Sequence, residues 1–348
     1  MTLVPVLVAG TALLLLVLAE AVVDLVAHRG LYTFRRTLGS LGSLVGNVVA
    51  TTLLKAGPFL AYGALADRIA LVKLPPSAWT WGVALLGIDL CFYWMHRASH
   101  RTQALWAIHE VHHGSEDLNL STAMRTPWLQ GVLATVNFMP LALLGIPTEI
   151  FVGAYMVWMC WGHSVHTRLV RRLGPLEWVM VTPSHHRAHH ACNPRYLDAN
   201  YAAMFIVWDR LFGTFVPEEE EPRFGLTHPR TGEDTVRANL LPLTALARDL
   251  AGADSAREAW SRLWEPPEVV ARRVPARALP ETPSLGAAAK GAALLALGAA
   301  ATAMVGFMVL RPHLSLAGSV GWTGLPLLLL ALSGHVVDGG RLLPRSRS

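Results

Sequence analysis

Six long apolar runs limit this chain of 348 residues to folds that a membrane can accommodate. They occupy residues 3–27, 41–64, 79–95, 129–161, 285–310 and 316–337. Inside a bilayer every backbone N–H and C=O group needs a partner from the protein itself, so runs of about 20 apolar residues are read as helices. The charged fraction of 15% and the mean hydropathy of +0.39 agree with this interpretation. We therefore predict an all-α, multi-pass transmembrane helical bundle.

Breaks in the apolar pattern divide the chain into four expected regions. The fourth run is interrupted by "GIP" at 145–147, which predicts two segments that form a hairpin. Residues 1–76 are expected to form N-terminal transmembrane helices, and residues 77–216 a catalytic core. Residues 217–284, which include "EEEE" at 218–221 and "RRVPARALPETPS" at 272–284, are expected to be a cytoplasmic loop and linker. Residues 285–348 are expected to hold a helix pair and a basic tail.

Arginine positions predict the orientation of the chain in the membrane, because cytoplasmic loops are enriched in Lys and Arg. Three groups are found, and they consist of Arg29, Arg35, Arg36; Arg168, Arg171, Arg172; and Arg341, Arg345, Arg347. All share one side if the first three runs cross in turn and the hairpin returns to the side that it left. The net charge of +5 does not indicate nucleic acid, since no basic stripe with interleaved aromatic residues occurs.

Histidines gather in three short motifs between residues 96 and 190. These are "HRASH", "HEVHH" and "HRAHH", with histidines at His96, His100, His109, His112, His113, His186, His189 and His190. Spacings of three and four residues place the imidazoles of each motif on one face of a helix. Burying so many unpaired rings would cost desolvation energy. The pattern therefore predicts a metal site, and the same is not assumed for single histidines such as His28.

The number of imidazoles predicts two metal ions, because one structural or catalytic ion usually takes three or four ligands from the protein. Imidazole suits iron, zinc and copper, so the ligand type alone does not select the metal. His96 follows directly on the third apolar run, which places the expected site at the membrane surface, on the cytoplasmic side by the arginine pattern. Cys91, Cys160 and Cys192 show no paired spacing, and no disulfide framework is expected.

The motifs in this order, followed by "NYAAMFIVWDRLFGTF" at 200–215, resemble the fatty acid hydroxylase and sterol desaturase superfamily of membrane-bound, histidine-rich di-iron oxygenases. Within that superfamily, "SEDLNLSTAMR" at 115–125, "LGPLEW" at 173–178 and "TPSHHRAHH" at 182–190 are similar to the alkylglycerol monooxygenase family. The resemblance covers residues 81–216 and implies that the eight histidines of the three motifs are ligands. It also implies one more ligand shortly before "LGPLEW", where His166 fits the distance better than His163.

The resemblance leaves four further residues beside the expected ligands. His185 precedes the matching His186 and is interpreted as a flanking group. Glu116, Asp117 and Asn119 are candidates to accept the remaining N–H of ligating imidazoles, as carboxylates and amides commonly do. Two positions depart from the alkylglycerol monooxygenase pattern, since Arg101 stands where that family has an acidic residue and Glu110 where it has an amide. Arg101 reverses the charge next to His100 and could remove a partner for the N–H donors of a pterin.

The resemblance also implies the chemistry: two Fe ions and O2 would hydroxylate a C–H bond of a lipid, with an ether lipid as the first expectation. Electrons would come from outside, because no flavin or nicotinamide motif is present. The donor would be a tetrahydropterin or a protein of the cytochrome b5 or ferredoxin type. The alternative is a sterol, carotenoid or fatty acid hydroxylase or desaturase with the same site. Two other classes, a non-catalytic metal-binding membrane protein and a metal-dependent hydrolase, fit the pattern less well.

Overall fold

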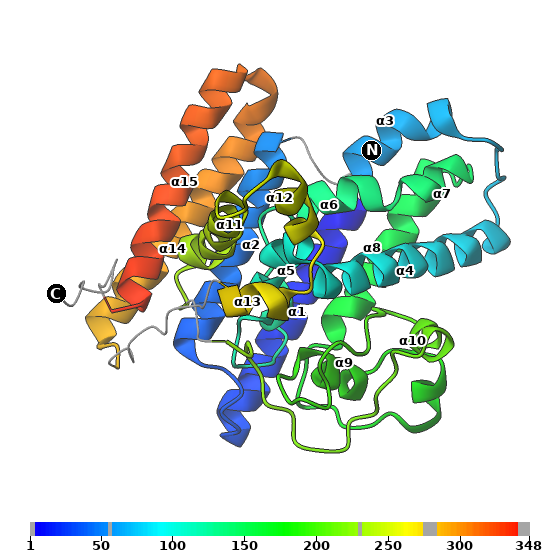
Figure 1. Cartoon of the computed structure of the whole chain (residues 1–348). Coiled ribbons are helices and arrows are strands. Elements are labelled where there is room, and N and C mark those ends of the chain that lie inside the picture. The colour runs from blue at the N-terminus through cyan, green and yellow to red at the C-terminus, as the bar shows by residue number, and fades with distance from the viewer. Residues whose placement is uncertain (1–3, 55–57, 229–231, 274–283, 340–348) are drawn as a thin grey trace.

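The fold is all-α, as predicted. The computed structural model describes residues 4–54, 58–228, 232–273 and 284–339, and its regular structure in these ranges is helical apart from two isolated β-bridges, which pair Met180 with Phe205 and Ala191 with Phe224. Figure 1 shows long helices at one side of the molecule and a region of short helices and connecting segments that contains α9 and α10.

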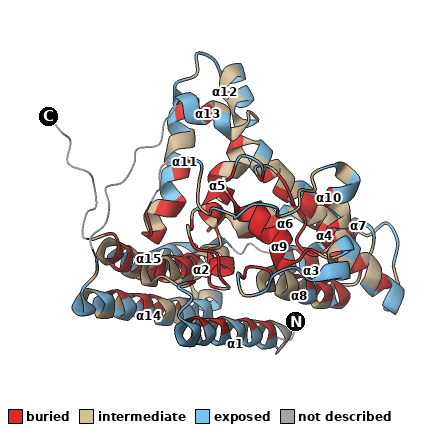
Figure 2. Ribbon diagram, turned by 90° about the horizontal axis from the view of Figure 1, so that it is seen from below, coloured by how far each residue is buried: buried red, intermediate tan, exposed pale blue. Residues whose placement is uncertain are grey.

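Five helices are long and apolar enough to cross a membrane. They are α1 (Val4–Ala27), α2 (Phe34–Leu54), α4 (Ala78–Arg101), α14 (Ala287–Leu310) and α15 (Leu316–Val337). In Figure 2, α1 and α14 carry many exposed residues, whereas buried residues gather on α9 and its neighbours. The exposed side chains of α1 and α14 include Leu25 and Leu295, so a wide apolar surface is left uncovered by the chain. A surface of this kind is suited to lipid, and the chain is an integral membrane protein.

The second apolar run forms two helices where the sequence predicted one interrupted span. The candidate span is α2, which begins at Phe34 and ends at Leu54, and a separate helix α3 occupies Pro58–Ile69. Proline favours the first turn of a helix and disfavours a helical residue before it, which explains the start of α3. α2 begins at Phe34, before the apolar run that starts at residue 41. Its first turn can include the charged Arg36 because this side chain forms ion pairs with Glu116 and Asp117.

The predicted hairpin is present as α6 (Gln130–Asn137) and α7 (Met139–Leu143) on one side and α8 (Thr148–Ser164) on the other. The turn between them requires Gly145, whose φ is +72° and whose missing Cβ would lie 1.8 Å from the carbonyl oxygen of Val72. The longest of these helices has 17 residues. The hairpin packs against α3 and α4 and contributes to the main apolar core.

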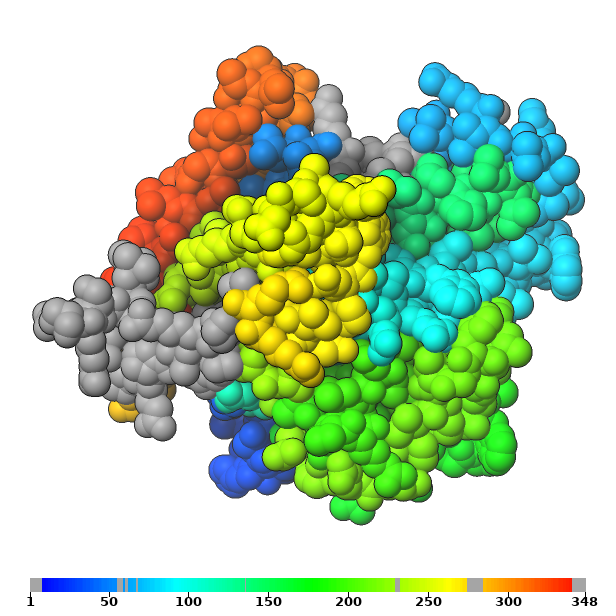
Figure 3. Space-filling view, viewed as in Figure 1, coloured from blue at the N-terminus to red at the C-terminus, as the bar shows by residue number. Residues whose placement is uncertain are grey.

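The region 217–284, expected to be a loop and linker, instead contains three helices. These are α11 (Thr235–Ala251), α12 (Ala256–Leu263) and α13 (Pro267–Arg273). Two of the three helices begin with a cap residue that is visible in the sequence. The side chain of Asp234 accepts hydrogen bonds from the backbone N–H groups of Val236 and Arg237 at the start of α11. The hydroxyl of Ser255 accepts one from the backbone N–H of Glu258 at the start of α12. The three helices pack against α5 (Gln103–His113), and Figure 3 shows them in yellow at the centre of one face.

Most of the linker at 272–284 and the basic tail from residue 340 lie outside the described residues.

The acidic run at 218–221 contacts the protein core and is not simply a solvated loop. Both carboxylate oxygens of Glu218 accept hydrogen bonds of 2.7 Å from the guanidinium group of Arg187. This bidentate pair ties the acidic run to α9 (Pro183–His190).

Candidate metal centre

Three helix ends bring the histidine motifs together. His96 and His100 lie on the last turns of α4, and Thr102 alone joins α4 to α5, which carries the second motif. Pro183 begins α9 and Ala191, in an extended conformation, ends it, so the third motif forms a helix of eight residues. His96 and His100 therefore belong to the same helix as the third apolar run, which is a candidate membrane span.

The structure divides nine imidazoles into two groups that could each hold a metal ion. The first group consists of His96, His100, His109, His113 and His189, and the second of His112, His166, His186 and His190. Within each group one nitrogen from every ring lies within 4.8 Å of the others. The rings of the two groups also touch, since the centroids of His113 and His190 are 4.4 Å apart. The arrangement is therefore two adjacent candidate sites.

Helix geometry explains how each HxxHH motif serves both groups. Residues four apart on a helix differ by about 40° in direction, whereas residues three apart differ by about 60° in the opposite sense. On α5 the pair His109 and His113 faces the first group and His112 faces the second. On α9 the assignment is reversed, because His186 and His190 face the second group and His189 the first. Two short motifs thus line two sites at once.

The structure distinguishes the three histidines that the sequence placed beside the motif ligands, which are His163, His166 and His185. His166 lies in the second group, with its Nε2 atom 2.8 Å from Nε2 of His186. The Nδ1 atom of His163 lies 2.8 Å from the carbonyl oxygen of Met159 in its own helix, and His163 is in neither group. His185 is also outside both groups and lines a separate cavity of about 210 Å³ with Glu177, Trp178 and Arg210 among its walls.

Backbone carbonyl groups orient four of the imidazoles. The Nδ1 atoms of His96 and His189 lie 2.7 and 2.9 Å from the carbonyl oxygens of Tyr201 and Ala199. In the second group, Nδ1 of His166 lies 2.9 Å from the carbonyl of Gly162, and Nδ1 of His112 lies 3.3 Å from that of Arg125. A carbonyl oxygen only accepts, so Nδ1 carries the proton in each ring and Nε2 presents a lone pair to the centre.

Two buried aspartates hold the segment that supplies Tyr201. Asp89, on α4, is fully buried and accepts hydrogen bonds from Trp158 Nε1 and from the backbone N–H groups of residues 203, 204 and 205. Asp209, on α10 (Val207–Phe212), accepts from the N–H groups of Tyr201 and Ala202. Neither aspartate was predicted from the sequence as part of the site. A carboxylate inside the third apolar run was a signal that could have identified Asp89.

Burial keeps the imidazoles outside the membrane-spanning segments in their neutral form. Desolvation lowers the pKa of His112 to about 3 and that of His189 to about 4. It also lowers the pKa values of His109, His113, His166, His186 and His190 well below the ordinary value, and neighbouring imidazoles add to this effect. Neutral imidazole is the form that binds a metal ion.

The grouped histidines fit a metal ion because the lone pairs of their Nε2 atoms point toward one another and no N–H or O–H donor of the described residues lies between them. Nε2 of His112 and Nε2 of His166 are 3.3 Å apart, although both Nδ1 atoms face carbonyl oxygens. Two lone pairs at this distance repel each other unless a cation lies between them. Among the described residues, the buried Nε2 atoms of His100, His189 and His190 also have no hydrogen-bond partner. Buried polar atoms of native proteins rarely remain in that state, and metal ions would satisfy them.

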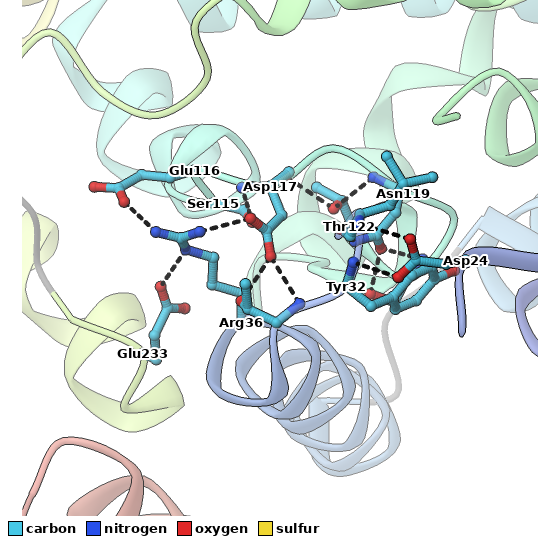
Figure 4. Close-up of polar contacts among 12 residues, drawn as sticks. Asp24, Tyr32, Arg36, Ser115, Glu116, Asp117, Asn119, Thr122 and Glu233 are labelled. Carbon is cyan, nitrogen blue, oxygen red and sulfur yellow. Dashed lines mark hydrogen bonds and ion pairs between the residues drawn. The ribbon is translucent and has the colours of Figure 1, made fainter. Parts of the chain in front are cut away.

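The structure corrects the role expected of Glu116, Asp117 and Asn119, which Figure 4 shows directed toward the N-terminal helices. Asp117 accepts hydrogen bonds of 2.6 Å from the hydroxyl of Thr33 and from Arg36, and Glu116 forms an ion pair with the same arginine. The side-chain amide of Asn119 donates to the carbonyl of Leu31. These residues attach the segment after α5 to the connection between α1 and α2, and backbone carbonyls take the role that we had assigned to them.

The acidic neighbour that is missing at position 101 is replaced from elsewhere in the chain. Arg101 lies 2.7 Å from Asp198, and the other carboxylate oxygen of Asp198 is 3.9 Å from Nδ1 of His100. A negative charge therefore lies near His100 although residue 101 is positive. Glu110 is buried on α5 with one oxygen 3.6 Å from Nε2 of His228. The charge reversal noted in the sequence is thus offset by a contact between distant residues.

Comparison with known proteins places the same segment in a family. The family model of fatty acid hydroxylases matches residues 81–214, which contain all nine grouped histidines. This segment of the chain is therefore similar to a fatty acid hydroxylase domain. The matched residues nearly coincide with residues 81–216, over which the motifs resemble the family. The matched segment thus begins on α4 and ends just after α10.

Several curated proteins are similar to the region of the fatty acid hydroxylase domain. Alkylglycerol monooxygenase from Xenopus tropicalis is 46% identical over 164 residues, which are 47% of this chain and 36% of that protein. The Homo sapiens protein of the same name is 44% identical over 164 residues, 47% of this chain and 37% of that protein. Ornithine lipid hydroxylase OlsE from Rhizobium tropici is 29% identical over 155 residues, 44% of this chain and 47% of that protein.

The similarity covers only part of each relative. The chain spans a little over a third of the length of the alkylglycerol monooxygenases that it matches. No solved structure matches the chain.

Proposed function

We propose that this protein is a membrane-bound di-iron oxygenase that hydroxylates a C–H bond of a lipid. The observation that carries the proposal is the pair of adjacent imidazole groups, one of five and one of four histidines, at the end of a membrane-spanning helix. The proposed ligands are the nine histidines of those groups. His163 and His185, which lie outside both groups, are assigned no ligand role.

The proposed reaction inserts one oxygen atom of O2 into a C–H bond and releases the other as water, with two electrons and two protons from an external donor. Bound iron would supply the oxidising power that protein side chains lack. The chain contributes nine neutral imidazoles, the carbonyl groups that orient four of them, and a buried surrounding that limits the access of water. Hydrolytic chemistry has no comparable support, since alkylglycerol monooxygenase and ornithine lipid hydroxylase OlsE are named for monooxygenase and hydroxylase activity.

An ether lipid is the first proposed substrate, because four alkylglycerol monooxygenases share between 38% and 48% identity with the chain over the aligned region. Hydroxylation of another lipid is the second candidate. It is favoured by the similarity to ornithine lipid hydroxylase OlsE, which has the same kind of domain on a different substrate. The nine histidines would serve either substrate, so the choice depends on the surfaces around them.

We propose a role for each region of the chain from its position relative to the segment that matches the fatty acid hydroxylase model. Residues 1–76 and 285–348 supply membrane helices on either side of the catalytic core at 77–216 in the sequence. Residues 217–273 supply the helices that pack against α5, and the cytoplasmic side is proposed for these helices and for the histidine-rich site.

Metal analysis and lipid profiling test the proposal together. Purified protein loaded with iron(II) should hold about two iron ions per chain, as expected for nine ligands. Cells that contain the protein should lose an alkylglycerol lipid, or gain a hydroxylated lipid, relative to cells that carry the His189→Ala variant. Protein that binds zinc but no iron, with unchanged lipid profiles, would contradict the proposal. A new hydroxylated lipid without ether-lipid loss would favour the second substrate class.

A tetrahydropterin is the proposed electron donor, and a protein of the cytochrome b5 or ferredoxin type is the alternative. The pterin is preferred because the segments 115–125 and 182–190 are similar to alkylglycerol monooxygenase. Purified enzyme with an alkylglycerol and oxygen is expected to turn over with tetrahydropterin and not with a ferredoxin system. Turnover with the ferredoxin system alone would exclude the pterin and leave the metal site unaffected.

The histidine-rich region is proposed to face the cytoplasm, in accordance with the arginine groups. Cys192 lies two residues after the last proposed ligand and is partly exposed, so labelling of its thiol shows on which side of the membrane the site lies. In a variant that keeps only this cysteine, an impermeant thiol reagent should leave intact cells unlabelled and label opened membranes. Strong labelling of sealed cells would reverse the orientation. A protein without cysteines gives the background.

A further inference from the structure

A buried carboxylate on the first membrane helix lies close to the four-histidine group. Glu20 is 4% exposed, and Glu20 and Asp24 are the only charged residues of α1. A charged side chain within a membrane-spanning helix is costly and usually faces partners in the protein interior. The position of Glu20 is also outside the segment 81–214 that matches the fatty acid hydroxylase model. Its partners therefore show what α1 contributes to that domain.

Glu20 accepts hydrogen bonds from three donors in different parts of the chain. One oxygen accepts from the hydroxyl of Tyr32 at 2.7 Å and from the backbone N–H of Leu120 at 2.6 Å. The other accepts from the hydroxyl of Thr167. Because all three partners donate, the carboxylate joins three segments that have no direct chain connection.

Two of these segments hold adjacent proposed ligands. Thr167 directly follows His166, and Leu120 lies in the segment between α5 and Arg125, whose carbonyl orients His112. His112 and His166 both belong to the four-histidine group, and their Nε2 atoms are 3.3 Å apart. A single carboxylate thus spans the two segments that determine the distance between these rings.

Two rings of the five-histidine group have supports of their own. His96 and His189 are oriented by the carbonyls of Tyr201 and Ala199, and that segment is held by Asp89 and Asp209. None of these contacts involves α1. Loss of the Glu20 contacts should therefore act on one group more than on the other.

We infer that Glu20 is a positioning residue that keeps His112 and His166 in place for the second metal ion. The inference rests on the proposed di-iron function, and it makes α1 a required part of the catalytic site although α1 lies outside the segment that matches the family model. Glu20→Gln keeps the size of the side chain but replaces one of its two acceptor oxygens with an NH2 donor. The glutamine can therefore no longer accept from Thr167 and from the Tyr32 and Leu120 pair at the same time.

Iron stoichiometry of the full-length protein in detergent tests the inference. Wild type should bind about two irons per chain and Glu20→Gln about one, with electron paramagnetic resonance showing uncoupled ferric iron in the variant. The matched control is Asp24→Asn. Asp24 lies one turn away, and its carboxylate accepts from the N–H groups of Leu31 and Tyr32, which lie in neither ligand segment, so this variant should keep both irons.

A second variant keeps the test decisive if Glu20→Gln does not fold. Thr167→Val removes the donor at the other end of the contact and should also lose about one iron, whereas Thr167→Ser should retain two. A folded Glu20→Gln or Thr167→Val protein with two coupled irons, or one that loses both equally, would overturn the inference. Absence of iron from wild type would instead refute the proposed function, so the two failures are distinguishable.

Discussion

Replacement of His112 or His189 by Ala is expected to abolish turnover and to lower bound iron. Each residue is the one imidazole that its helix contributes to its group, because the paired histidines of the same motif face the other group. No neighbouring ring can rotate into the vacant position, since the carbonyl contacts and dense packing hold the remaining rings. Changes to residues that only orient a ligand commonly cost 10- to 100-fold, so we expect a loss of more than about 100-fold here.

The measurements are the turnover of an alkylglycerol and the iron content of the purified variants. His28→Ala is the control, because His28 is exposed and belongs to neither group. It should retain wild-type iron and activity. Full iron and full turnover in His189→Ala would show that the proposed ligand set is wrong, whatever the result for His112→Ala.

Asp89→Ala is expected to cause the largest loss of stability among single substitutions outside the histidines. The change leaves Trp158 Nε1 and three backbone N–H groups without their acceptor in a site that is fully buried. An unpaired buried donor costs about 1–3 kcal/mol, so a total loss of more than about 3 kcal/mol in the free energy of unfolding is expected. Thermal unfolding in detergent would show this loss as a lower midpoint.

Two comparison variants make the result specific. Asp89→Asn keeps the oxygen that accepts from Trp158, Ala203 and Met204 and loses only the contact with the Phe205 N–H, so a smaller loss is expected. Asp254→Ala changes an exposed aspartate and should alter stability by less than about 0.5 kcal/mol. Equal midpoints for Asp89→Ala and Asp254→Ala would contradict the role of Asp89.

The helices of the fold were largely predictable because their signals are local. The runs at 285–310 and 316–337 became α14 and α15 almost without change, since apolar length alone makes a helix the stable form in lipid. The helices α11 and α12 were missed although their caps, Asp234 and Ser255, are present in the sequence. The second apolar run, 41–64, was treated as one segment, although Pro58 begins a separate helix, α3.

The histidine motifs by themselves determined which imidazoles would come together, because spacings of three and four residues place side chains on one helix face. Only the tertiary structure decided how they divide. Which ring of α5 faces which ring of α9 depends on the crossing of the two helices, and no local pattern encodes that crossing. The same holds for Tyr201, Arg125, Asp198 and Glu20, whose contacts join residues between 13 and 147 positions apart. Sequence spacing specifies the faces of single helices, whereas long-range packing specifies the partners.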